Sequence, residues 1–251
     1  MNSKRIVMAA LMSVALALPA VAQPAQAEDA QTKIQQSVTK EIQSKKFSKV
    51  TANVDGTTVT LNGTVDKLAD KLVLDKKVRK IHGVSAVNDQ VSVAGTVDDA
   101  QLKQQLAKKL AYDRAGYWNV FDDVRLDVND GVVTLSGTTR DYPARDSAIA
   151  TAENMPGVKA VRNEINVAPA SSFDDELRLR LLRAIYGNSV LSKYGMDPAS
   201  PIRIAVTNGH VELDGTVMNK MDRQIAGMQA NSVPGVFSVV NHLQVENDVA
   251  R

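Results

Sequence analysis

Val59-Thr60-Leu61-Asn62-Gly63-Thr64-Val65 decides the fold, because two similar segments follow it in the chain. The second is Val133-Thr134-Leu135-Ser136-Gly137-Thr138-Thr139, and the third is Val211-Glu212-Leu213-Asp214-Gly215-Thr216-Val217. Valine and leucine alternate with polar residues in each copy, which is typical of a β-strand with one buried face. The sequence therefore contains an internal repeat, and the repeat defines the fold.

A second glycine follows each copy at a fixed distance. It belongs to the phrases Ile81-His82-Gly83-Val84, Met155-Pro156-Gly157-Val158 and Val233-Pro234-Gly235-Val236. The two glycines of a copy are always 20 residues apart, whereas the copies follow each other at intervals of 74 and then 78 residues. Constant spacing within copies and variable spacing between them predict folded units joined by adjustable segments. We therefore treat six glycines as structural markers of the repeat: Gly63, Gly83, Gly137, Gly157, Gly215 and Gly235.

Each strand phrase is preceded by a turn signal: Asp55-Gly56, Asp130-Gly131 or Asn208-Gly209. Such pairs favour the positive φ angles of a two-residue hairpin turn, so the phrase is expected to be the second strand of a β-hairpin. A further alternating segment, such as Val158–Val167, predicts a third strand after the second glycine.

Two helices complete each unit. Upstream of the hairpins, apolar residues recur at helical spacing in three stripes: Ile34, Val38 and Ile42; Leu102, Leu106 and Leu110; Leu177, Leu181, Leu182 and Ile185. Between the second and third strands, the expected core faces are Leu68, Leu72, Val73 and Val78; Ala148, Ile149, Ala152 and Met155; Met218, Met221, Ile225 and Met228. Methionine is also common at adaptable binding surfaces, but the helical period of Met218, Met221 and Met228 favours a core role.

The predicted fold class is therefore α+β, with three tandem α-β-β-α-β modules. Each module is expected to be a three-stranded mixed sheet with two helices packed on it. The expected limits are residues 28–97 for module 1, 98–169 for module 2 and 172–247 for module 3.

Residues 1–27 are interpreted as a secretory signal peptide. Lys4 and Arg5 precede an apolar run of 13 residues, Ile6–Leu18, and Ala25-Gln26-Ala27 offers a cleavage pattern. The run is shorter than the roughly 20 apolar residues of a spanning helix, so we expect a periplasmic protein, peripheral rather than integral to the membrane. The chain has no cysteine, so each core must hold without disulfides.

Charge and motifs argue against two classes of function. Without Lys4 and Arg5 the chain carries equal numbers of basic and acidic residues, which does not support nucleic-acid binding. The three histidines occupy unrelated places in their repeats, and no catalytic, phosphate-binding or metal-binding motif is present. We expect neither an enzyme nor a cofactor or metal.

Two surface features are candidates for binding. Basic residues cluster on the second helix of module 1: Lys67, Lys71, Lys76, Lys77, Arg79 and Lys80. They suit anionic lipid headgroups, although a solvated helix face whose cations complement the helix dipole is favoured as the alternative. Aromatic residues cluster in module 2, at Tyr112, Tyr117, Trp118 and Phe121. Packing, partly between modules, is favoured there over a lipid or partner surface, because a three-stranded sheet buries little by itself.

The repeated V-x-L-x-G-T phrase, the helix, the P-G-V phrase and the final N-x-[IL]-x-V strand resemble the BON domain, named from bacterial osmotically inducible and nodulation proteins. Modules 2 and 3 match fully, and module 1 departs at Ile81-His82 and Asp89-Gln90-Val91. The resemblance implies an envelope protein that binds anionic phospholipid or another envelope macromolecule under osmotic or membrane stress. A chaperone-like stabiliser of exported proteins is the alternative. The sequence leaves the ligand and the oligomeric state open.

Overall fold

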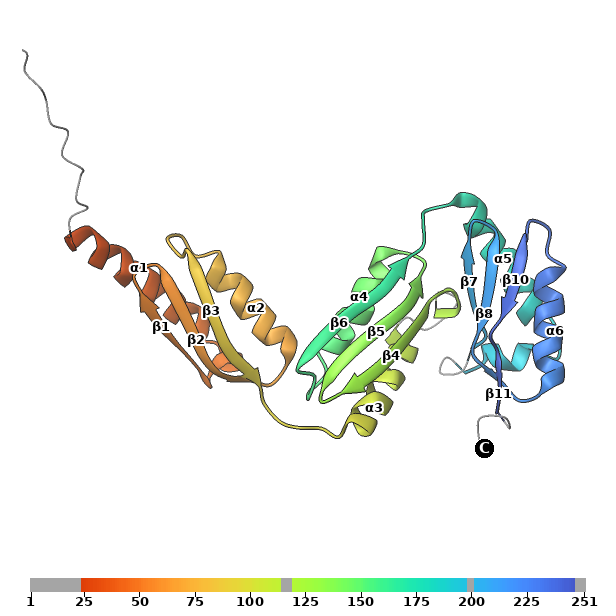
Figure 1. Ribbon diagram of the computed structural model, residues 1–251, viewed down its shortest axis with the longest axis horizontal. Coiled ribbons are helices and arrows are strands. Elements are labelled where there is room, and N and C mark those ends of the chain that lie inside the picture. The colour runs from red at the N-terminus through yellow and green to blue at the C-terminus, as the bar shows by residue number, and fades with distance from the viewer. Residues whose placement is uncertain (1–23, 114–118, 198–200, 247–251) are drawn as a thin grey trace, which may run out of the picture.

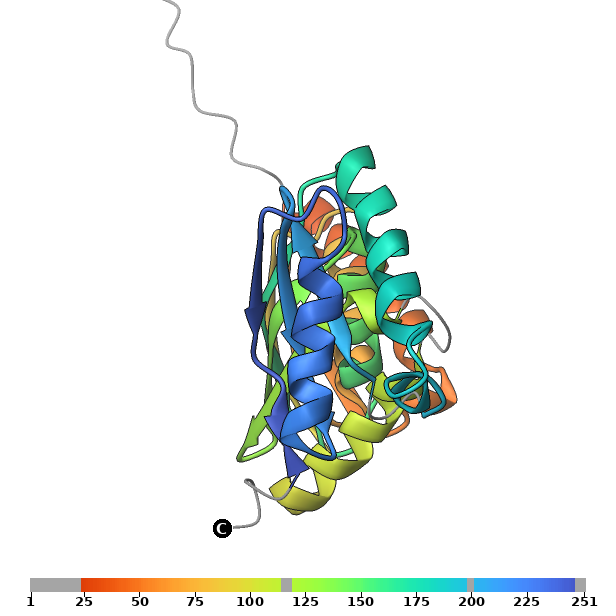
Figure 2. The same ribbon diagram turned by 90° about the vertical axis from the view of Figure 1, so that its right-hand side faces the viewer.

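The computed structural model describes residues 24–113, 119–197 and 201–246. Figure 1 shows three small sheets in a row, each carrying its own helices. In the view turned by 90°, the strands gather on one side of the molecule and the helices on the other (Figure 2). The α+β prediction of three repeated modules, each a three-stranded mixed sheet with helices, is confirmed.

Module 1 contains α1 (Pro24–Ile42), η1 (Lys45–Phe47), β1 (Val50–Asp55), β2 (Thr58–Val65), α2 (Leu68–Arg79) and β3 (Ala86–Val93). The strand order is β1-β2-β3. β2 pairs antiparallel with β1 and parallel with β3, so the repeated phrase forms the central strand. α2 connects the two parallel strands.

Module 2 repeats this order with α3 (Asp99–Asp113), η2 (Asn119–Phe121), β4 (Asp123–Asn129), β5 (Val132–Thr139), α4 (Tyr142–Glu153) and β6 (Ala160–Val167). Module 3 contains α5 (Ser172–Tyr186), η3 (Ser192–Gly195), β7 (Arg203–Thr207), β8 (His210–Asp214), β9 (Thr216–Val217), α6 (Lys220–Asn231), β10 (Ser238–Asn241) and β11 (Gln244–Val245). β8 and β9 together correspond to β2, and Gly215 lies between them.

The first glycine of each repeat lies where two backbones come close. Gly63, Gly137 and Gly215 have φ angles of 120°, 101° and 130°. A Cβ atom on these residues would lie 2.1 Å from the Lys49 carbonyl oxygen, 2.1 Å from that of Asp123, and 2.6 Å from that of Pro201. Glycine is required here for two reasons, since other residues would be strained and would also collide with the chain that enters the first strand.

The hairpin turns follow the prediction in modules 2 and 3. Asp130 and Gly131 have φ angles of 51° and 76°, and Asn208 and Gly209 have φ angles of 50° and 78°. In module 1 the register differs, because Asp55 pairs with Thr58 and the loop is therefore Gly56-Thr57. Only Gly56 has positive φ there, so glycine occupies the first central position of this turn.

The helix faces were predicted with unequal success. All three first-helix stripes are buried or half-buried, with Val38, Leu106 and Leu181 fully enclosed. The second-helix prediction was right for Leu68 and Val78 in module 1 and for Ala148, Ala152 and Met155 in module 2. Ile149 and Ile225 are partly buried against the cores. It was wrong for Leu72 and Val73 in module 1 and for Met218, Met221 and Met228 in module 3, which are exposed.

The observed core positions of the second helices are equivalent in the repeat. They are Leu74 and Val78, Ala148 and Ala152, and Ala226 and Ala230. One turn earlier, Asp222 is also buried, because its carboxylate accepts hydrogen bonds from Tyr194 (2.5 Å) and Lys193 (2.8 Å). In α6, small and acidic residues therefore occupy the core face, whereas Met221 and Met228 are exposed.

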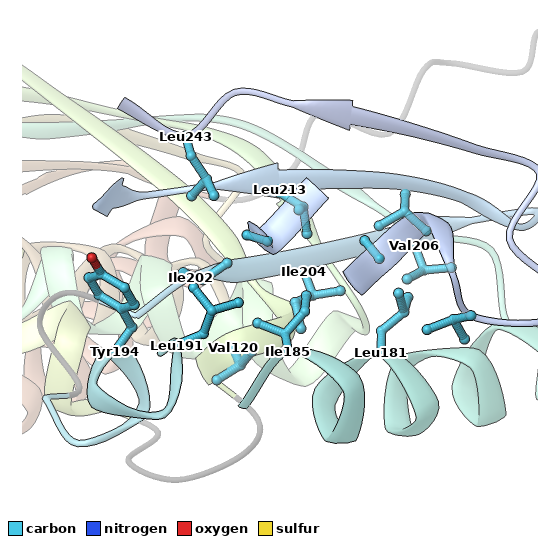
Figure 3. Packing of buried hydrophobic residues seen from close by; sticks show 14 of the residues in the cluster. Val120, Leu181, Ile185, Leu191, Tyr194, Ile202, Ile204, Val206, Leu213 and Leu243 are labelled. Atoms are coloured by element: carbon cyan, nitrogen blue, oxygen red, sulfur yellow. The ribbon is translucent and has the colours of Figure 1, made fainter. Parts of the chain in front are cut away.

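Neighbouring modules share parts of their cores. Val120 and Phe121 of η2 belong by sequence to module 2, yet they pack with Leu181, Ile185 and other core residues of module 3 (Figure 3). This confirms the expected packing between modules for Phe121, which is only 4% exposed. Leu68 of α2 packs in the same way into the core of module 2.

The shared core predicts that a substitution in module 2 destabilises module 3. Phe121→Ala removes a buried ring and should lower the free energy of unfolding of module 3 by about 3 kcal/mol. Urea denaturation followed by NMR signals of module 3 would measure the loss. Tyr112→Ala, at an exposed aromatic of the same segment, is the matched control and should change little. Equal effects of the two substitutions would contradict the shared core.

The close approach at the repeat glycines predicts a second stability effect. Gly137→Ala should lower the free energy of unfolding by about 2 kcal/mol or more, because it adds a backbone clash to an unfavourable φ. Gly95→Ala is the control, since Gly95 has a φ of 85° but no atom within 4 Å of an added Cβ. Urea denaturation of both variants separates the clash from the φ strain, and equal losses would show that no clash exists.

Candidate functional site

The outward face of α2 combines apolar and basic side chains. Leu72 and Val73 are 44% and 47% exposed, since Leu74 and Val78 take the buried side of the helix. Lys76 and Lys77 follow one turn later, and Lys80 caps the helix; all three are exposed. Residues three and four apart are neighbours on a helix, so the apolar pair lies beside the cationic group. We call Leu72, Val73, Lys76, Lys77 and Lys80 the α2 face.

Most acidic residues near the α2 face are paired with cations outside it. Asp70 pairs with Lys46 at 3.1 Å, and Asp66 with Lys49 at 3.5 Å. Asp75 accepts a 2.7 Å hydrogen bond from Arg79, which raises the pKa of the Arg79 guanidinium. These pairs leave the cations of the α2 face partly uncompensated.

Among the lysines of the α2 face, Lys77 alone has an ion pair with a described residue, namely Glu41 at 2.7 Å. Within the described part of the chain, neither Lys76 nor Lys80 has a carboxylate within 4 Å. Lys67 precedes the helix as its N-terminal cap residue and is half-buried. The negative end of the α2 dipole lies at the C-terminus of the helix. It stabilises Lys76, Lys77 and Lys80 even without a bound ligand.

Lys71 points to the sheet instead. Its ammonium group donates a 2.6 Å hydrogen bond to the carbonyl oxygen of Val91 and lies 3.5 Å from the Asp89 carboxylate. Asp89 in turn accepts the Val91 N–H at 2.9 Å. Both outward-pointing backbone groups of Val91 are therefore satisfied at the outer edge of β3. Lys71 has a structural role and does not belong to the α2 face.

The same arrangement recurs at the other last strands. Asn163 accepts the N–H of Ile165 at 3.1 Å, and Asn241 accepts the N–H of Leu243 at 3.2 Å. The polar residue that opens the N-x-[IL]-x-V pattern thus binds the backbone two residues later. Because this contact recurs in all three modules, we attribute the N-x-[IL]-x-V pattern to protection of the free sheet edge.

The remaining predicted residues divide into two groups. Tyr117 and Trp118 lie outside the described residues. The six repeat glycines are described, and all have positive φ angles. Gly83, Gly157 and Gly235 lie three residues beyond the helix caps Lys80, Asn154 and Ser232, so they form the turn into the third strand instead of the cap itself.

Sequence reasoning missed the carboxylates that hold the hairpin turns. Asp99 accepts the backbone N–H groups of Asp130 (2.7 Å) and Gly131 (2.9 Å). Asp174 is buried and accepts those of Asn208 (2.8 Å) and Gly209 (2.9 Å). Both carboxylates come from the first turn of a helix, α3 or α5. The signal that could have identified them is an aspartate in the first helical turn of modules 2 and 3. Each of these modules also has a hairpin turn with two backbone N–H groups that need acceptors.

Carboxylates of two modules meet at the junction of modules 2 and 3. Arg125 lies 2.7 Å from the buried Asp123 and 3.5 Å from Asp214. Burial, followed by the charge of Asp123, raises the pKa of Asp214, and Arg125 opposes the shift. The guanidinium thus compensates both acids, and the arrangement is a link between modules. Among the described residues, no group of three or more histidine, aspartate or glutamate side chains could hold a metal ion.

Comparison with known proteins connects this architecture to a family. The family model described as "BON domain" matches residues 26–95, 98–169 and 188–247, which together make up most of the chain. The chain belongs to the BON domain family. The resemblance seen in the repeated phrases is thereby confirmed. Across the described ranges 24–113, 119–197 and 201–246, none of the helices has the length and apolar character needed to cross a membrane.

One curated relative of this BON protein is "Osmotically-inducible protein Y" of Escherichia coli (strain K12). It is 28% identical over 130 residues, which cover 48% of this chain and 62% of the relative. The match therefore spans about three fifths of the relative's length. Two solved structures of CdsD, a structural protein of the Type III secretion system of Chlamydia trachomatis, are 18% and 17% identical. They cover 86% and 90% of this chain and 95% and 99% of their own, with TM-scores of 0.25 and 0.22.

Proposed function

We propose that this protein is an exported, non-enzymatic BON protein that binds anionic phospholipid headgroups of the cell envelope. The observation that carries the proposal is the α2 face, where two exposed apolar residues lie beside three exposed lysines. A solvated helix face does not need exposed leucine and valine next to its charges. A membrane interface offers both a negative surface for the lysines and an apolar layer for the other two side chains.

The expected strength of this interaction is modest. Each lysine near an anionic surface contributes about 1 kcal/mol, so the three lysines contribute roughly 3 kcal/mol at low salt. Burial of Leu72 and Val73 adds an apolar contribution of similar order. Such a site binds reversibly and peripherally. Further contacts from the same chain would raise the effective concentration, which gives tandem modules an advantage over a single one.

The relative's name supports an osmotic role, and the signal-peptide pattern of residues 1–27 supports the periplasm as the location. In that compartment the chain would meet the headgroups of both bounding membranes. We propose that it acts there under osmotic or envelope stress.

Liposome sedimentation tests the lipid proposal. Combined substitution of Lys76, Lys77 and Lys80 by glutamate should abolish binding of the full processed chain to vesicles containing phosphatidylglycerol at low salt. Serine at Leu72 and Val73 should weaken binding several-fold and leave its salt dependence intact, because the charges remain. Neither variant changes a buried position. The glutamates oppose the dipole at the C-terminal end of α2, so the lysine variant should lose a little thermal stability and remain folded.

Lys108→Glu with Lys109→Glu is the matched control, since these lysines are exposed on α3. If the control lost binding as strongly as the α2 variant, the interaction would be a general charge effect. Equal sedimentation of the unchanged protein with anionic and neutral vesicles would remove the lipid proposal.

A chaperone-like role is the second candidate, and the exposed methionines of α6 favour it. Met221 and Met228 are both 61% exposed, and Ile225 lies half-buried between them. Methionine is flexible and polarizable, so such a stripe adapts to varied apolar partners. The only acidic residue within α6 is Asp222, which is buried. The stripe therefore suits apolar segments of a non-native exported protein.

Suppression of aggregation tests this second role. Met221→Ser with Met228→Ser should reduce the protection of a chemically unfolded client, measured by light scattering without lipid, because apolar contact area is lost. Leu72→Ser with Val73→Ser serves as the control and should preserve protection. If the α6 variant protects the client as well as the unchanged protein, the methionine stripe has no part in such a role.

A further inference from the structure

The sheet of module 1 has an open face whose three central rows carry no charged side chain. β2 presents Val59, Leu61 and Val65 to the helices, so its other residues face away from them. The strand register aligns three rows on that side: Asn53, Thr60 and Asn88; Thr51, Asn62 and Gln90; Thr64 and Ser92. Asp89 lies on the helix side, beside Leu61. Asp55 lies on the open side, but in the outermost row at the hairpin turn, with Thr58 and Ala86. We call the residues of these three rows the amide face.

The absence of charge is specific to this module. In module 2 the equivalent rows contain Asp127 and Arg162, then Arg125 and Glu164. In module 3 they contain Glu212 and Asp214. Module 1 has the largest share of basic residues, yet none of them lies in these three rows. Composition alone therefore does not explain a neutral face.

The amide face is also rich in available hydrogen-bonding groups. Within the described residues, the side-chain amides of Asn53, Asn62, Asn88 and Gln90 have no hydrogen bond to other protein groups. Each amide is both a donor and an acceptor, and each threonine or serine hydroxyl is the same. Neighbouring rows lie about 7 Å apart along the strands, and neighbouring side chains about 5 Å apart across them. The face is a regular grid of neutral donors and acceptors.

We propose that the amide face binds a neutral glycan chain that carries hydroxyl and acetamido groups. A hydroxyl-rich ligand needs donors and acceptors in alternation, which amides and hydroxyls supply and lysine or carboxylate groups do not. Acetamido groups pair with side-chain amides through two complementary hydrogen bonds. Desolvation of neutral amides costs less free energy than desolvation of charged groups. The amide face therefore suits a neutral ligand better than a charged one.

The position of the face agrees with this partner. The strands of all modules lie on one side of the molecule and the helices on the other (Figure 2). The amide face and the α2 face therefore point in different directions, so a glycan on the sheet leaves α2 accessible. The inference does not depend on lipid binding, since it rests on a different surface of module 1.

Chitin, an insoluble polymer of N-acetylglucosamine, is the probe. The full processed chain should sediment with chitin, to an extent that does not change between low and high salt. Asn62→Asp with Asn88→Asp replaces two amides by carboxylates of the same shape and should lower the bound fraction about tenfold, because an unpaired charge must then be desolvated. Titration with soluble chitohexaose should shift NMR signals of residues 51–64 and 86–92.

Asn129→Asp with Asn166→Asp makes the same change on the sheet of module 2 and should leave binding unaltered. Urea denaturation shows whether the variants remain folded, and vesicle sedimentation of the Asn62/Asn88 variant should match that of the unchanged protein. No binding of the unchanged protein to chitin would overturn the proposal, as would retained binding by the folded variant. If the variant instead dissociates a dimer in analytical ultracentrifugation, the face is an interface between copies and the proposal is wrong.

Discussion

In each module the chain that enters the first strand lies directly against the α-carbon of a glycine in the second strand. The backbone of Lys49 lies against Gly63 in this way, the backbone of Asp123 against Gly137, and the backbone of Pro201 against Gly215. The contact fixes where the hairpin begins and bends the central strand through a positive φ. The second helix starts a few residues later, so its direction over the sheet depends on this bend. A larger residue at the glycine would separate the strands on which both helices pack.

The fold followed from the sequence wherever a residue type has a single structural use. Asn208-Gly209 needs positive φ angles, and a stripe such as Leu102, Leu106 and Leu110 has no alternative to the core. The second helices failed this test in part. Leu74 was missed in module 1, and in module 3 the core positions are filled by alanine and even by Asp222. Ranking by hydrophobicity then selected Leu72 or Met221, which are exposed. Only alignment of the three repeats, position by position, would have identified the buried face.

The candidate surfaces were harder to predict than the fold, since exposure depends on tertiary contacts. Lys71 and Lys76 are alike in sequence, but the strand edge binds one and leaves the other exposed. The neutrality of the amide face is visible only after the register aligns Asn53 with Thr60 and Asn88. The three modules thus share one scaffold and differ in what their surfaces present. The shared core at Phe121 holds modules 2 and 3 together, whereas module 1 contributes Leu68 to its neighbour.

The aspartate or asparagine in each last strand has a consequence for duplication itself. Three homologous sheets on one polypeptide are always present at high local concentration, and their outer strands are similar enough to pair with one another. Such pairing would produce swapped or fused sheets during folding. Asp89, Asn163 and Asn241 each occupy a backbone N–H that a foreign strand would need. Because every copy carries this blocked edge, a gene can be lengthened by duplication of the module. Each added module is already protected against pairing with the sheets of the other modules.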